Sequence, residues 1–197
     1  MVSLHAYFDH VSESDQSSRV MRLNQHLKSP LTKLVLLLLE FALDSMCKFN
    51  AVFQLSLPML PALKREVKRL LKILLGRFLK AEAIQEAEAD LTALDLNDPL
   101  LQLAEKELGI GHTTWAYLSD EEDFLDPRTR KIFFNRVRDF YITVASTIMK
   151  KFSFSDNVVD DVAFLMPENQ ASVDVAAVFR MAERFPAAVC QGSLRCS

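Results

Sequence analysis

Two long stretches of the chain carry apolar residues at the spacing of one helix face. In residues 61–80 the apolar positions lie 0, 4, 7, 8, 11, 12 and 15 residues from Leu63, and in 127–152 they lie 0, 4, 7, 8, 11, 15 and 19 from Phe133. Both patterns follow the 3.6-residue period of an α-helix. A third stretch, 30–55, is apolar nearly all round in its first half, which is typical of a helix buried on most sides.

Prolines and short polar residues predict where these helices begin and end. Ser29-Pro30 offers an N-cap followed by proline at the first helical position. Pro58 and Pro61 separate the first long helix from the second. Ser155-Asp156 and Ser172 are candidate caps for two helices near the C-terminus. Residues 94–119 are expected to be rich in loops, with short helical turns. Shorter helices are predicted over 19–28, 81–93, 157–165 and 173–185.

Composition supports a helical chain. Among 197 residues there are 4 glycines, and 30 leucines stand against 6 isoleucines. Strands favour β-branched residues and tight turns need glycine, so this balance favours helices. We expect an all-α protein, an irregular multi-helix bundle built on long helices near 30–55, 61–80 and 127–152. Residues 1–29 should form short helices and a loop, 30–189 the helical domain, and 190–197 a frayed tail.

Charge, cysteine content and hydropathy exclude several classes of protein. A net charge of −3 gives no global attraction to nucleic acid or anionic membrane. The three widely spaced cysteines, Cys47, Cys190 and Cys196, are typical of reduced thiols rather than of a disulfide framework. Polar residues near the N-terminus interrupt the apolar stretch that a signal peptide needs. Glu40 interrupts the most apolar run, 34–43, which is too short to span a bilayer. We expect a nuclear or cytoplasmic protein without membrane contact.

The sequence carries no common catalytic or cofactor motif. No P-loop, dinucleotide-binding glycine motif, HExxH or nucleophile elbow occurs. His5, Asp9 and His10 lie in a terminus that we expect to be frayed, which disfavours a metal site. The acidic run 120–123 fits the solvated start of a helix better than a metal site. Trp115 is either a stacking platform for a base or, more commonly, a core anchor. We expect no metal and no cofactor.

A basic helix face is the one sequence feature that suggests a functional site. Residues 61–80 have a net charge of +6, with Glu66 as their single acid, whereas 81–107 hold eight acids and one base. Such a face could contact DNA phosphates with steep salt dependence. It could equally be solvated or neutralised by the acidic segment that follows it. The candidate contact residues are Lys64, Arg65, Lys68, Arg69, Lys72 and Arg77.

Several short motifs occur in a recognisable order. The matching segments are residues 29–34 (SPLTKL), 39–41 (LEF), 48–54 (KFNAVFQ), 74–80 (LLGRFLK), 94–99 (LDLNDP), 108–111 (LGIG) and 137–143 (VRDFYIT). In order and spacing the chain resembles the core region of vertebrate hAT-superfamily transposase-derived proteins, a group often fused to BED-type or MYM-type zinc fingers. The resemblance covers about residues 4–189, and Ala81 stands where the family usually has proline.

The resemblance implies that this chain lacks the catalytic carboxylates of the family. Such transposases hold two divalent metals with three carboxylates of an RNase H-like core. The matched region lies between the second catalytic aspartate and the catalytic glutamate, so no residue here takes a catalytic role. It corresponds to the family's helical insertion. We therefore expect a non-enzymatic fragment of a domesticated or truncated transposase that contacts an unidentified protein and has no small-molecule substrate. The alternative is a module that contacts DNA weakly and without sequence preference through the basic face.

Overall fold

The computed structural model describes residues 18–54, 62–120, 126–152, 154, 158–162 and 174–186. Within these ranges the chain forms helices joined by loops, and the only strand-like pairing is a single antiparallel bridge between Leu79 and Gln102. The all-α class is therefore confirmed for the described residues. His5, Asp9 and His10, which the sequence disfavours as metal ligands, and the tail 190–197 lie outside them. None of the helices in these ranges has the length and apolarity needed to cross a bilayer.

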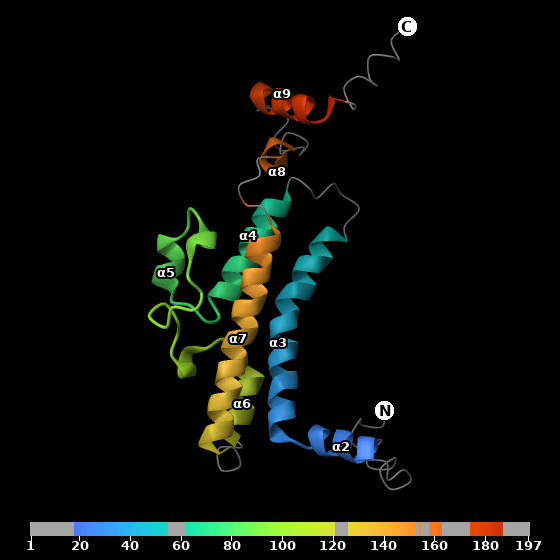
Figure 1. Cartoon of the computed structure of the whole chain (residues 1–197), viewed down its shortest axis with the longest axis vertical. Coiled ribbons are helices and arrows are strands. Elements are labelled where there is room, and N and C mark those ends of the chain that lie inside the picture. The colour runs from blue at the N-terminus through green and yellow to red at the C-terminus, as the bar shows by residue number, and fades with distance from the viewer. Residues whose placement is uncertain are drawn as a thin grey trace.

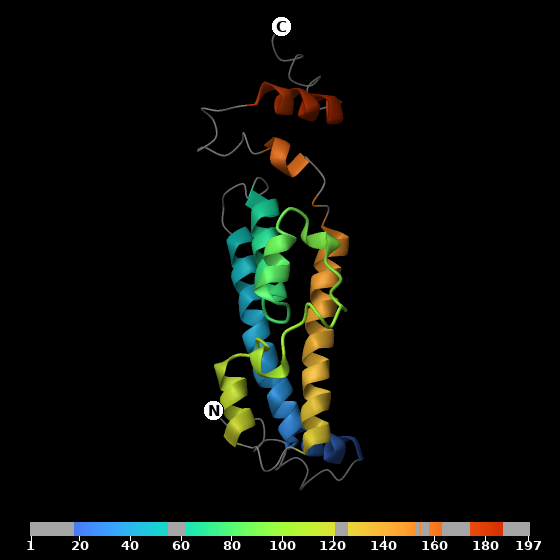
Figure 2. The same ribbon diagram turned by 90° about the vertical axis from the view of Figure 1, so that its left-hand side faces the viewer.

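Three long helices run alongside one another and form the body of the molecule (Figures 1 and 2). They are α3 (Pro30–Phe53), α4 (Leu63–Leu75) and α7 (Pro127–Lys151). The helix α6 (His112–Asp120) packs on α3. At one end lies α2 (Ser18–Leu27), and at the other lie α8 (Val158–Asp161) and α9 (Val175–Arg184). The short helix α5 (Ala81–Glu86) and the loop after it lie beside α4 and α7.

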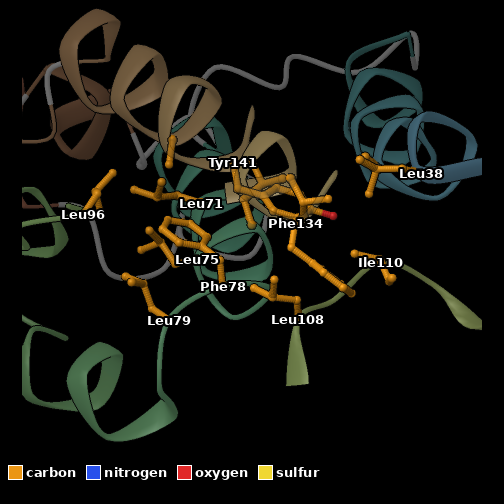
Figure 3. Close-up of a cluster of buried hydrophobic side chains, with 14 of the residues drawn as sticks. Leu38, Leu71, Leu75, Phe78, Leu79, Leu96, Leu108, Ile110, Phe134 and Tyr141 are labelled. Atoms are coloured by element: carbon orange, nitrogen blue, oxygen red, sulfur yellow. The ribbon is translucent and has the colours of Figure 1, made fainter. Parts of the chain in front are cut away.

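Leucines and aromatic residues from α3, α4 and α7 fill the space between these helices. Leu71, Phe133 and Tyr141 are wholly buried, and Tyr141 and its neighbours meet at the centre of the cluster in Figure 3. The rings of Tyr141 and Phe78 stack with centroids 6.1 Å apart. The Tyr141 hydroxyl donates a hydrogen bond of 2.6 Å to the Gly109 carbonyl. Burial raises the pKa of Tyr141, and the nearby Arg77 opposes this rise. The predicted stripe of 61–80 thus lies in the core, whereas that of 127–152 is buried in its first half and only partly buried at Phe140 and from Val144 onward.

The helix expected over 61–80 ends at Leu75, five residues early. Residues 77–80 instead exchange backbone hydrogen bonds with the loop that follows α5. The Lys80 amide donates to the Leu101 carbonyl at 2.9 Å, and the Phe78 carbonyl accepts from the Leu103 amide at 2.8 Å. These groups gain partners outside the helix, and the turn carries Phe78 into the core. Sequence periodicity did not reveal the turn because Phe78 keeps the spacing of the stripe.

The prediction that α3 is buried on most sides is wrong. Only Leu34, Leu38 and Ala42 of this helix are buried. Leu36 keeps 55% of its surface exposed, and Val35 and Leu43 keep 37% and 45%. In the body of the bundle α3 contacts α4, α6 and α7. These helices do not cover the apolar side chains of Leu36 and Leu43. An apolar sequence predicts that a helix can be buried all round, but it does not supply the neighbours that would bury it.

Aspartates cap the later helices at positions that differ from the expected ones. The acidic run 120–123 was expected at the start of a helix, but Asp120 is the last residue of α6, and 121–123 lie outside the described residues. Asp126 caps α7 instead, accepting hydrogen bonds from the amides of Arg128 and Thr129. Asp174 caps α9, whereas the expected caps Ser155, Asp156 and Ser172 lie outside the described ranges. The helix predicted over 81–93 divides into α5 and a 3₁₀ turn, Leu91–Ala93.

Candidate functional site

Five of the six candidate DNA-contact residues lie on one side of α4, here called the basic side. The opposite side of the helix carries its buried leucines and valine, so the 3.6-residue period places these cations away from the core. None of the five is buried. The basic side comprises Lys64, Arg65, Lys68, Arg69 and Lys72.

Two of these cations are engaged by one residue of the acidic segment. The Lys68 ammonium lies 3.1 Å from Glu88 Oε1 and donates to the Glu88 main-chain carbonyl at 2.8 Å. The Lys72 ammonium contacts Glu88 Oε2. Hydrogen bonds from Lys72 and then Lys68 hold the pKa of Glu88 below its usual value. The acid-rich segment therefore folds back against part of the basic side.

The two arginines of the basic side share a partner within α4 itself. Arg65 Nε lies 3.1 Å from Glu66 Oε1, and Arg69 Nη1 lies 3.6 Å from Glu66 Oε2. Both arginine side chains are 72% exposed, whereas that of Glu66 is 13% exposed. Glu66 is thus an internal counter-ion for cations that still face solvent. Sequence analysis noted Glu66 only as an isolated acid, although its spacing of three from Arg69 could have suggested the pair.

Arg77 does not belong to the basic side. Its guanidinium lies 4.3 Å from the centre of the Phe41 ring and donates from Nη1 to the Ala42 carbonyl at 3.3 Å. Gly109 lies against the arginine stem so closely that a Cβ there would fall 2.9 Å from Arg77 Cγ. Arg77 is therefore a partly buried link between α3 and the 108–111 loop. A continuous helix over 61–80 already places Arg77 outside the arc of the other cations, so only its charge made it a candidate DNA contact.

A groove of about 360 Å³ separates the second half of α3 from α4. Asp44 and Lys48 line it from α3, and Arg69 lines it from α4, as does Glu66. Arg77 also lines the groove. Asp44 and Lys48 are joined by a 2.7 Å ion pair. The groove brings together charged residues that are 33 positions apart in the chain, so sequence spacing gave no sign of it.

The remaining candidates do not gather into a site. Trp115 is partly buried and packs on Phe134 with ring centroids 5.8 Å apart, as expected of a core anchor. No group of three or more His, Cys, Asp or Glu side chains in the described ranges could hold a metal ion. Cys47 is an exposed thiol, and Cys190 and Cys196 lie outside the described residues.

Comparison with known proteins gives no family or fold assignment. No protein-family model, curated protein or solved structure matches this chain. Functional inference therefore depends on the residues and their arrangement.

Proposed function

We propose that the chain is a non-catalytic helical module, related to hAT-type transposases, that acts by contacting another protein. The observation that carries the proposal is the uncovered apolar side of α3, formed by Leu36 and Leu43, with Val35 at its edge. At about 100° per residue Leu36 and Leu43 fall on the side of α3 away from Leu34, Leu38 and Ala42. Apolar residues gathered on one exposed helix face are typical of a surface that another helix covers. The motif order described above supports the transposase descent.

Charge pairing within the chain makes DNA contact the weaker candidate. Lys68 and Lys72 already bind Glu88, and Arg65 and Arg69 already flank Glu66. A cation that must leave an internal partner before it binds a phosphate contributes less to DNA affinity. The observation that keeps DNA contact as the second candidate is the 72% exposure of Arg65 and Arg69.

A pair of variants tests the protein-contact proposal. The double variant Leu36→Glu, Leu43→Glu places two charges on the uncovered apolar side, whereas Asn135→Glu adds a charge to an exposed polar position of α7. All three proteins should have similar melting temperatures, because none of the altered side chains is buried.

Cross-linking in cells that express the tagged chain should identify a protein held by the wild type and by Asn135→Glu. Its purified form should bind the double variant at least tenfold more weakly. Sedimentation velocity distinguishes a second copy of the chain from a different protein as the partner. A wild-type chain that stays monomeric and cross-links the same proteins as the double variant would disprove the proposal.

A further inference from the structure

The groove between α3 and α4 contains one cation that no carboxylate neutralises. Lys48 pairs with Asp44, and Arg69 pairs with Glu66. Among the described residues Arg77 has no carboxylate partner: it contacts the Phe41 and Tyr141 rings, the Tyr141 hydroxyl and the Ala42 carbonyl. A partly buried charge is expensive to leave without a counter-ion, so this groove favours an anion.

The Arg77 guanidinium is held in place before any ligand arrives. The Phe41 ring stacks beside it, the Ala42 carbonyl accepts one of its five N–H groups, and Gly109 packs against its stem. A fixed guanidinium loses little side-chain entropy on binding, and its planar donors match the two oxygens of a carboxylate.

Both helices contribute apolar side chains to the groove beside its charged ones. Phe49 and Val52 line it from α3, and Ile73 lines it from α4 with 41% of its surface exposed. The Phe49 ring is braced by Phe53, with centroids 4.9 Å apart. Apolar side chains beside charged groups that orient a ligand are the usual arrangement of a small-ligand site, and about 360 Å³ lies within the usual size range.

The lining charges select the charge of the ligand. Three cations and two carboxylates leave the groove with a net charge of +1. Asp44 and Glu66 repel a ligand with several negative charges, whereas a single carboxylate matches the one unpaired cation. We infer that this groove binds a small aliphatic monocarboxylate, with the carboxylate on Arg77 and the alkyl chain between Val52 and Ile73. This inference does not depend on the protein-contact proposal.

Nuclear magnetic resonance titration of the full chain at low salt tests the site. Hexanoate is the probe, and hexylamine, protonated at neutral pH, is the control with the same chain and opposite charge. Hexanoate should shift amide signals of residues 41–52 and 66–77 along one binding curve. Hexylamine should leave these signals unchanged. Equal shifts with both probes, or hexanoate shifts scattered outside the groove, would overturn the inference.

Two variants and a control assign the binding to the named residues. Arg77→Gln should weaken hexanoate binding at least tenfold, whereas Lys80→Gln removes a nearby cation that does not line the groove and should leave binding unchanged. Ile73→Glu places a charge in the groove wall without altering a buried residue, and it too should weaken binding at least tenfold. The Ile73→Glu variant tests hexanoate binding in the groove even if Arg77→Gln fails to fold. Undiminished binding by either folded variant would overturn the inference.

Discussion

Replacing Leu71 with alanine should cost more stability than any exposed substitution on α4. Leu71 is wholly buried among α4 and α7 side chains, as Figure 3 shows. The change removes three carbons, worth about 2.4 kcal/mol at roughly 0.8 kcal/mol per buried CH₂. The buried side chains around Leu71 cannot fully fill the cavity that the substitution leaves. The cost of this cavity brings the loss in free energy of unfolding to about 2–5 kcal/mol. For a domain of this size that corresponds to a fall in melting temperature of roughly 4–20 °C.

Urea denaturation followed by far-ultraviolet circular dichroism measures this loss. Ile73→Ala is the matched control, because Ile73 is on the same helix two residues away but 41% exposed. It should cost about 1 kcal/mol or less. An unchanged urea midpoint for Leu71→Ala, or a larger loss for Ile73→Ala than for Leu71→Ala, would mean that the buried side of α4 is wrongly assigned.

Three further outcomes are expected. Tyr141→Phe leaves the partly buried Gly109 carbonyl without its donor and should lower the free energy of unfolding by about 0.5–1.5 kcal/mol in the same urea assay; a gain in stability would contradict the role of this hydrogen bond. Asp126→Ala should lower the melting temperature at pH 7, because hydrogen bonds from Thr129 depress the pKa of Asp126 below 3.8 in the folded chain. The stabilisation by the ionised Asp126 carboxylate is present above pH 3.8 and is lost as the pH falls through its lower folded pKa. The melting temperatures of the wild type and Asp126→Ala should therefore converge in acid; a difference that does not change with pH would contradict the role of the carboxylate. Purified protein should show no Mg²⁺- or Mn²⁺-dependent cleavage of duplex DNA, and cleavage abolished by one Asp or Glu substitution would contradict the non-catalytic proposal.

Sequence patterns predicted best the helices whose bounds depend on residues within the helix itself. The stripe on 127–152 is regular over about five turns from Phe133, and α7 spans Pro127–Lys151 almost as predicted. Pro30 fixes the start of α3, although Ser29 forms no side-chain cap bond there. These features depend on local spacing and on the fixed backbone of proline, which a single sequence displays directly.

The features that sequence patterns missed depend on distant partners. The early end of α4 depends on hydrogen bonds with residues more than twenty positions away. The exposed side of α3 depends on how many helices pack against it. The change of sign after residue 80 suggested internal neutralisation, but the choice of Glu88 among eight acids needed the fold. For the same reason the sequence did not reveal the contacts of Arg77 with Phe41 and Gly109.

We expect the ion pairs with Glu88 and Glu66 to keep the cations of the basic side from binding DNA. Fluorescence anisotropy with a labelled duplex at 50 mM salt measures this on the wild type and on the double variant Lys68→Glu, Arg69→Glu. We predict no measurable DNA binding by the wild type, and a slightly lower melting temperature for the double variant because its ion pairs with Glu88 and Glu66 are lost. Wild-type binding with a slope of log affinity against log salt of about −4 to −5, abolished in a double variant of unchanged stability, would contradict this expectation.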